Sequence, residues 1–405
     1  MEFLIQAWLE LTPIEIVQRL AMWVIGGVLI FLAIKKEMEP ALLLPIGFGA
    51  ILVNIPGTNV LGEEITHICS ECGKIWEDGA LKCVTDGCQG AMQVSSSMGV
   101  IQWLFEVGIE ASEALPILLF IGIGAMIDFE PLIVNPKLMI LGAFAQLGIF
   151  LTIILAVLLG FPLTDAASIG IIGAADGPTS ILVAMKLGSQ YIGPIMVVAY
   201  SYMALVPIIQ PAAIKMVTTK KERMIRMDYT GKKVPKIVKI LFPIVVTIVA
   251  GCIAPASLAL VGFLMFGNLL KECGVLGSLA DTAKNQLANL ITLLLGITIA
   301  FQMQADKFLS LETLMIMGLG LAAFVLDTFG GIFCAKFINL FSKKKINPMV
   351  GAAGISAFPM SARVVHKMGL KEDPTNYLLM HAVGANVSGQ IASAIVGGLI
   401  IGLVI

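Results

Sequence analysis

The 405-residue sequence carries little charge: only 13% of its residues are Asp, Glu, Lys or Arg, whereas 58% are hydrophobic. Soluble domains usually carry about 25% charged residues, so a soluble enzyme, a nucleic-acid-binding protein and a disordered scaffold are excluded. Seven cysteines are too few for a disulfide-built scaffold. The N-terminus lacks the basic segment and small-residue cleavage site of a signal peptide, so we expect residues 16–34 to be a retained membrane span.

Long apolar runs and 41 glycines are present instead. They predict an all-α polytopic protein of the cell membrane, with close helix contacts and lipid around it. Runs long enough to cross about 30 Å of hydrocarbon lie at 16–34, 137–160, 191–214, 286–303, 313–340 and 376–405. Shorter or broken runs lie at 41–56, 114–127, 237–254 and 256–270.

Two stretches, 170–180 and 347–359, are rich in glycine, proline and small polar residues although apolar runs flank them. Such backbone survives at membrane depth only when it is buried in protein or lines a cavity. The two stretches also match each other: the alignment that pairs Gly170 with Gly351 pairs Pro178 with Pro359. Chance similarity of apolar segments is the alternative, but the shared order favours an internal repeat.

Basic residues predict the orientation of the chain. Residues 215–239 hold nine basic residues against two acidic ones, and Lys343–Lys345 form a second basic loop. Both loops should be cytoplasmic by the positive-inside rule. Four predicted spans, an even number, separate the two loops, so both lie on the same side of the membrane, as the rule requires. Five crossings separate the repeat starts, so the repeats are predicted to be inverted, with one hairpin entering from outside and the other from the cytoplasm.

We therefore expect five parts in the chain. They are N-terminal spans (1–56), an extramembrane four-cysteine insertion (57–97), a first inverted repeat (98–217) with hairpin 165–188, a basic cytoplasmic loop with linking spans (218–285), and a second inverted repeat (286–405) with hairpin 347–369.

Asp176 is the most informative candidate residue. It lies within Gly-Ala-Ala-Asp-Gly-Pro-Thr-Ser between apolar runs, where a carboxylate costs about 3 kcal/mol or more. Asp-Gly-Pro is also good chemistry for a surface turn. The repeat and the apolar flanks favour a buried cation or proton site.

Other oxygen-bearing side chains accompany this carboxylate. Asn347 opens the second interrupted stretch, Asn386 interrupts the last span, and Tyr202 lies in the span after the first hairpin. Amide, hydroxyl and carboxylate oxygens are hard ligands that suit Na⁺. A helix cap is the alternative for Asn347, and an interfacial tyrosine is the alternative for Tyr202.

Arg363 follows the second interrupted stretch, seven residues after Ser356. A planar guanidinium can hold a carboxylate or a ureido oxygen through paired hydrogen bonds. An arginine that extends to the cytoplasmic interface is an equally good interpretation of the spacing.

Four clustered cysteines, Cys69, Cys72, Cys83 and Cys88, form a C-x₂-C and C-x₄-C pattern in an acidic segment. The pattern suits a zinc-ribbon-like site with tetrahedral Zn²⁺, and two disulfides are the alternative. We expect a structural insertion on the outer side of the membrane.

Three linked motifs place these residues together: Gly-Ala-Ala-Asp176-Gly-Pro-Thr-Ser, Asn347-Pro-x₂-Gly-x-Ala-Gly-x-Ser-Ala-x-Pro-x₂-Ala-Arg363, and Gly-x-Asn386-Val-x-Gly. They resemble the β subunits of the sodium-ion-translocating biotin-dependent decarboxylases, the family that serves oxaloacetate, methylmalonyl-CoA, glutaconyl-CoA and malonate decarboxylases. The resemblance runs from about residue 100 to the end of the sequence. The four-cysteine insertion departs from the family pattern.

The resemblance implies a primary sodium pump. A carboxyltransferase α subunit moves CO₂ onto the biotin of a carrier subunit, and the β subunit decarboxylates carboxybiotin, consumes a proton and exports Na⁺ by an elevator-like motion. It also implies a small γ or δ membrane subunit and a homotrimer. The implied sodium-binding residues are Asp176, Tyr202, Asn347, Gly351, Ser356 and Asn386. The implied catalytic residues are Asp176, Tyr202, Ser356 and Arg363.

Two other functions fit the same residues. A secondary Na⁺- or H⁺-coupled carboxylate transporter or antiporter would need the same hairpins, Asp176 and Arg363. A non-transporting assembly subunit would leave Asp176 replaceable. The acid that the complex decarboxylates is chosen by a different polypeptide.

Overall fold

The structure is a computed structural model, and it describes residues 8–9, 11–37, 40–58, 60–61, 66–69, 72, 75–76, 92–95, 99–111, 113–227 and 233–405. Within these residues, seven helical segments are long and apolar enough to cross a membrane. They are α2 (Pro13–Lys35), α7 with α8 (Leu138–Leu158), α11 (Ile192–Val217), α13 (Lys236–Ile253), the segment Gly277–Gln302, which includes α16 (Ala288–Ile299), α18 (Leu311–Phe341) and α21 (Leu379–Val404). The prediction of a multi-pass helical membrane protein is confirmed.

Shorter elements complete the described fold. The helices are α3 (Pro40–Leu52), α4 (Val100–Phe105), α5 (Ala114–Met126), α6 (Glu130–Val134), α9 (Leu163–Gly170), α10 (Gly177–Lys186), α12 (Lys220–Arg223), α14 (Leu258–Glu272), α15 (Gly277–Asp281), α17 (Ala305–Phe308), α19 (Pro348–Ala352) and α20 (Met360–Glu372). The 3₁₀ turns are η2 (Ile171–Ala174), η3 (Pro255–Ser257) and η5 (Ala300–Gln302), and the π turns are η1 (Glu106–Glu110) and η4 (Thr282–Leu287).

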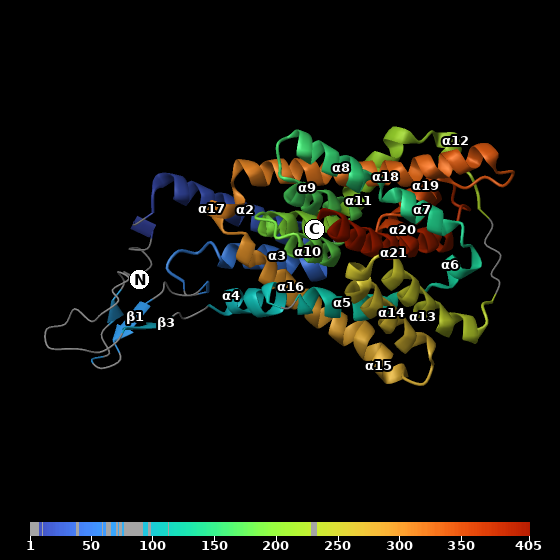
Figure 1. Ribbon diagram of the computed structural model, residues 1–405. Helices are drawn as coiled ribbons and strands as arrows, with labels where there is room; N and C mark the ends of the chain where they lie inside the picture. Colours follow the sequence, from blue (N-terminus) through green and yellow to red (C-terminus); the bar gives the residue numbers. More distant parts are fainter. Residues whose placement is uncertain are drawn as a thin grey trace.

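A small antiparallel sheet lies in the predicted insertion, with strand order β2 (Ile75–Trp76), β1 (Thr66–Cys69), β3 (Met92–Ser95). Strands β1 and β3 lie at the opposite end of the molecule from α6 and α12 (Figure 1). Because α12 belongs to the basic loop, the sheet and this loop are at opposite ends of the helical body.

The predicted span 137–160 is interrupted. Helix α7 (Leu138–Ala145) ends and α8 (Leu147–Leu158) begins at Gln146. The Gln146 Nε2 donates to the Gly142 carbonyl at 3.2 Å and to the Gly354 carbonyl at 3.4 Å. This buried side chain therefore connects the interruption to the second interrupted stretch, a long-range contact that local hydropathy does not encode.

Both glycine- and proline-rich stretches form broken helices. The first consists of α9, η2 and α10, and the second consists of α19 and α20. Helices α19 and α20 lie nearer to the end that carries α12 and α6, whereas α9 and α10 lie nearer to the sheet end (Figure 1). The main core packs around the second broken helix and includes Phe324, Met349, Ile355 and Val387.

The C-terminal end of α20 is fixed to the basic loop by Asp373, which accepts from Arg226 Nε at 2.7 Å and from the Thr375 N–H at 3.0 Å. These hydrogen bonds lower the pKa of Asp373 to about 2. Because the pKa of Asp373 is lower in the folded protein than in the unfolded protein, its carboxylate stabilises the fold at pH values above the ordinary pKa of the carboxyl group. This stabilisation is lost as the pH falls through about 2.

We expect Asp373→Asn to lower the melting temperature at neutral pH, because the charged pair with Arg226 is lost. The difference between wild type and variant should shrink as the pH falls from about 4 toward about 2. Melting curves of both proteins across this range measure the difference. A constant difference at every pH would contradict the assigned ion pair.

Candidate ion site at the junction of the broken helices

Asp176 lies at the first break. The preceding residue, Ala175, has a φ of 54°, which ends η2, and α10 then begins with Asp176 at the N-cap and Pro178 in its first turn. Proline is favoured there because its missing N–H has no helical acceptor to lose. The break leaves Asp176 only 3% exposed, so the carboxylate is buried and does not lie in a surface turn; the cation or proton site stays a prediction.

Three side chains donate to one oxygen of this carboxylate. Asp176 Oδ2 accepts from Thr179 Oγ1 at 2.6 Å, from Gln390 Nε2 at 3.0 Å and from Ser393 Oγ at 3.3 Å. Sequence analysis missed Gln390 and Ser393. Their spacing from Asn386, four and seven residues along α21, places all three on one helix face and could have identified them.

The two broken helices meet directly. Ser356 donates from both its backbone N–H and its Oγ to the Ala174 carbonyl, at 3.0 and 2.9 Å. Asn386 Nδ2 donates to the Ile355 carbonyl at 2.6 Å, and its buried Oδ1 has no hydrogen-bond partner within the described part of the chain. Asp176, Ser356 and Asn386, all predicted as site residues, thus border the same junction.

Of the two tyrosines of α11, Tyr200 lies beside the Asp176 segment, whereas the prediction named Tyr202. Tyr202 OH donates to the Met317 carbonyl of α18 at 2.6 Å. Tyr200 instead packs its ring against Gly177, directly after Asp176, and its buried OH has no partner among the described residues. Residues two apart on a helix point in different directions, so Tyr200 faces the Asp176 segment while Tyr202 faces α18.

Asn347 occupies the helix-cap position that was its alternative interpretation. Its Oδ1 accepts from the Met349 N–H at 3.0 Å, and its Nδ2 donates to the Arg223 and Ile225 carbonyls at 2.8 Å. Both polar atoms of the Asn347 side chain are therefore hydrogen-bonded to backbone groups. These bonds fix the start of α19 against the basic loop.

Gly351 is a packing residue in this arrangement. A Cβ at Gly351 would collide with the Gly331 carbonyl oxygen of α18, and a Cβ at Gly331 would collide with the Gly351 carbonyl oxygen. The two backbones touch, as small residues allow in membrane helix pairs.

Gly351→Ala is expected to lower the melting temperature of the purified protein by about 5 °C or more, because backbone atoms cannot move aside for the added methyl group. Gly318→Ala is the matched control, since no atom lies within 4 Å of the Cβ position there. A Gly351→Ala protein that melts normally but binds Na⁺ weakly would make Gly351 an ion ligand instead.

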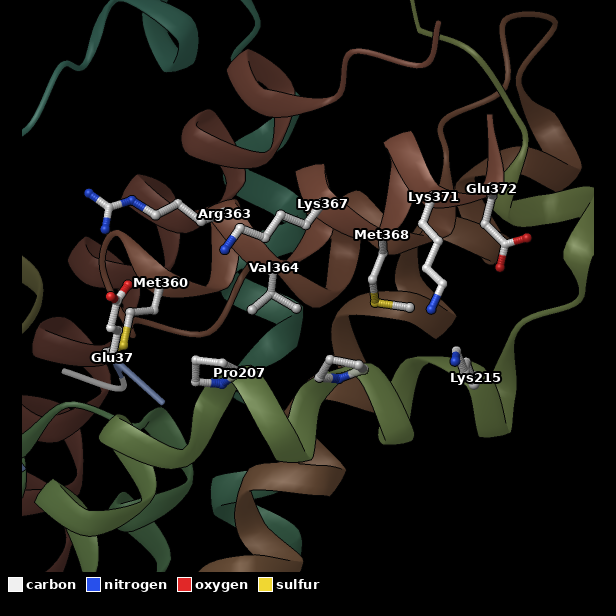
Figure 2. A pocket seen from close by; sticks show the side chains of 11 residues that line it. Glu37, Pro207, Lys215, Met360, Arg363, Val364, Lys367, Met368, Lys371 and Glu372 are labelled. Atoms are coloured by element: carbon white, nitrogen blue, oxygen red, sulfur yellow. The ribbon is translucent and has the colours of Figure 1, made fainter. Parts of the chain in front are cut away.

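Arg363 lies in a separate cavity of about 430 Å³ between α11 and α20. Arg363, Lys367 and Lys371 follow one another at four-residue intervals along α20, and Lys215 projects from α11 (Figure 2). Met360, Val364, Met368, Pro207 and Pro211 supply the apolar wall, and Glu37 and Glu372 are its two acidic residues. The Arg363 side chain is exposed and lines this cavity, so it is not part of the buried junction.

The predicted zinc site is only partly within the described residues. Cys69 ends β1 and is buried, and Cys72 is exposed, whereas Cys83 and Cys88 lie outside the described residues. No group of three His, Cys, Asp or Glu side chains that could hold a metal occurs in the described ranges. Zinc therefore stays a prediction.

Comparison with known proteins bears on the whole chain. A family model described as the Na⁺-transporting oxaloacetate decarboxylase beta subunit matches residues 18–404. The methylmalonyl-CoA decarboxylase subunit beta of Propionigenium modestum is 48% identical, with 94% of each chain covered. The oxaloacetate decarboxylase beta chain of Klebsiella pneumoniae is 43% identical, again with 94% of each chain covered. The chain therefore belongs to the family of Na⁺-transporting oxaloacetate decarboxylase beta subunits.

Proposed function

We propose that this β subunit decarboxylates carboxybiotin, presented by a biotin carrier subunit after an α subunit has loaded it, and uses the reaction to export Na⁺. The observation that carries the proposal is the junction at Asp176. A buried carboxylate in a membrane protein is costly unless it serves a cation or a proton. Here it lies where two broken helices meet, the position at which transporters of this type bind ions.

The proposed sodium site uses oxygen atoms at this junction. Asp176 supplies the charge. Neutral oxygens come from Ser356 and from Asn386 Oδ1 and Tyr200 OH, which have no hydrogen-bond partner in the part of the chain that the structure describes. Carboxylate, amide, hydroxyl and carbonyl oxygens are the ligands that hard cations prefer. Predicted roles for Tyr202, Asn347 and Gly351 would require a conformation in which their present contacts are released.

The cavity beside Arg363 is the proposed carboxybiotin site. Decarboxylation breaks the bond between the ring nitrogen and the carboxyl carbon, releases CO₂ and adds one proton to the nitrogen. Arg363 offers paired donors to the carboxylate, Lys367 adds positive charge, and Met360 and Val364 give an apolar surface to the rings. The cavity lies on α20, close to the basic loop that we assign to the cytoplasm.

We infer that the two broken helices belong to inverted repeats that move against each other. Each predicted repeat has a long span, a broken helix and a second long span, in the same order. Helices α19 and α20 lie closer to the end that carries α12 than α9 and α10 do (Figure 1). Relative motion of such units alternately opens a central site to each side.

Avidin tests the pump against a secondary carboxylate transporter. Avidin that sequesters carrier biotin should stop Na⁺ uptake by inverted vesicles containing the whole complex, and free biotin added with the avidin should restore it. Na⁺ uptake that continues when biotin is sequestered would establish the secondary transporter instead.

Asn386→Ala is expected to raise the Na⁺ concentration for half-maximal transport about tenfold, because one oxygen ligand contributes about 1.4 kcal/mol. The measurement is Na⁺-dependent decarboxylation by the whole complex. Asn339→Ala is a control, since this amide bonds to Ile346 in the loop after α18 and to no other residue within the described ranges. An unchanged Na⁺ dependence in Asn386→Ala would remove Asn386 from the ion site.

We also propose that the complex contains a small γ or δ membrane subunit and three copies of this chain. We further propose that a structural Zn²⁺ is bound on the outer side of the membrane by Cys69, Cys72, Cys83 and Cys88. The position of β1 and β3 at the end opposite the basic loop supports that side (Figure 1). One zinc per chain, lost in Cys69→Ser with pumping retained, would support the metal site. Metal-free protein with two protected disulfides would refute it.

A further inference from the structure

Asp327 is a second buried carboxylate in a predicted span, and no motif of the sequence analysis includes it. It lies in the middle of α18 and is 0% exposed. Its Oδ1 accepts from the Ile149 N–H at 3.0 Å. Its Oδ2 has no hydrogen-bond partner among the described residues. Asp327 is thus a buried acid with only one oxygen engaged.

The position of Asp327 is fixed from two sides. Ile149 is in the first turn of α8, just after the interruption at Gln146, and its N–H also donates to the Gln146 carbonyl at 3.2 Å. On the other side, a Cβ at Gly173 would lie 2.7 Å from Asp327 Oδ2. Glycine at 173 therefore leaves room for the carboxyl group against η2, three residues before Asp176.

The repeat alignment gives this position a counterpart. Pairing Gly173 with Gly354 also pairs Gln146 with Asp327, and Gln146 Nε2 reaches the Gly354 carbonyl at 3.4 Å. Each side chain therefore faces the glycine at the break of the other repeat. Of the two, only Asp327 can bind a cation through an ionisable oxygen.

The surroundings of Oδ2 favour a proton over a metal cation. A hard cation needs several oxygen ligands around it. Oδ2, however, has no hydrogen-bond partner among the described residues, and Gly173, whose Cβ position would lie 2.7 Å from it, has no side chain that could supply an oxygen ligand. An ionised carboxylate with an unpaired oxygen is strongly disfavoured there, and one bound proton removes the charge without further ligands.

Ionisable neighbours on the packed elements are few. Helices α7, α8 and α19 and the turn η2 contain no acidic, basic, Cys or Tyr residue. From α9, Asp165 is held by Ser189 and Gln190. The remaining ionisable residues on α11 and α18 are Tyr200, Tyr202, Lys215, Glu312, Cys334 and Lys336. The nearest of these on α18 is Cys334, two helical turns along.

We propose that Asp327 is a proton-binding site separate from the ion site at Asp176. The Asp327 site holds a proton in the arrangement seen here and exchanges this proton when η2 moves away from α18. The binding site stands on the geometry alone. The exchange during transport rests on the proposed pump function.

Difference infrared spectroscopy of the purified complex tests the binding site. Wild type and Asp165→Asn should both show, near neutral pH, a carbonyl band of a protonated carboxylic acid that is missing in Asp327→Asn. Asparagine keeps an oxygen that accepts from the Ile149 N–H, so the fold should persist. Identical spectra of wild type and Asp327→Asn would show an ionised helix cap and overturn the proposal.

Transport tests the exchange. Asp327→Asn should reduce pumping about tenfold or more and flatten its pH dependence, with an unchanged Na⁺ concentration for half-maximal activity. Asp327→Glu, which keeps a carboxyl group, should restore part of the rate. Such a partial rescue would not be expected if Asp327→Asn lost activity only because it folds poorly. Normal pumping by Asp327→Asn, together with loss of the infrared band, would overturn the exchange. Failure of the avidin test would overturn the pump and leave the infrared result standing.

Discussion

Asp176→Asn is expected to lower the apparent Na⁺ affinity of the complex by at least about 100-fold, in effect abolishing Na⁺-dependent carboxybiotin turnover. The variant keeps the shape of the side chain but removes its charge. At an effective dielectric constant of about 20, a unit charge pair about 4 Å apart contributes about 4 kcal/mol, and about 2.8 kcal/mol already corresponds to 100-fold. The donors Thr179, Gln390 and Ser393 would also face an amide in place of a carboxylate.

The measurement is decarboxylation by the whole complex as Na⁺ is varied, with assembly checked by size-exclusion chromatography. Asp165→Asn is the matched control. Asp165 is a second buried acid in the same hairpin, and its oxygens are held by Ser189 and Gln190 away from the junction. Asp165→Asn should leave the Na⁺ dependence unchanged. Normal Na⁺ activation of an assembled Asp176→Asn complex would remove this carboxylate from the pump.

Arg363→Lys is expected to reduce carboxybiotin decarboxylation by at least about tenfold even at saturating Na⁺. Lysine keeps the positive charge but replaces the planar pair of donors by a single ammonium group, and hydrogen bonds to charged groups are worth about 1.5–3 kcal/mol. Arg363 is exposed and lines the cavity between α11 and α20 (Figure 2), which is why we propose that it acts on the biotin side.

Single-turnover decarboxylation of carboxybiotin on the carrier subunit measures this step. Arg226→Lys is the matched control, because Arg226 is exposed near the same end of the molecule but pairs with Asp373 and does not line this cavity. Its turnover should remain close to that of wild type. If additional Na⁺ alone restored Arg363→Lys, Arg363 would belong to the ion site.

Sequence analysis predicted the classes of residue at the site better than their geometry. Asp176 is identifiable because a carboxylate within an apolar, glycine-rich stretch has few structural uses. The choice between Tyr200 and Tyr202 could not be made from the sequence, since it depends on the rotation of α11 against α10. Gln390 and Asp327 were not predicted, although Gln390 lies four residues after Asn386 and Asp327 is a carboxylate within an apolar span. Their partners, Asp176 and Ile149, are distant in sequence, and only the structure identifies them.

The sequence alone determined the membrane class, the main spans, the two interrupted stretches and the basic end of the molecule. These properties depend on runs of neighbouring residues, because a bilayer requires about 20 apolar residues per helix and excludes unpaired backbone from lipid. Only the tertiary structure decided which side chains converge. Ser356 reaches Ala174, Gly351 touches Gly331 and Asp327 faces Gly173. Such contacts depend on how helices distant in sequence rotate and pack, and local composition does not encode this.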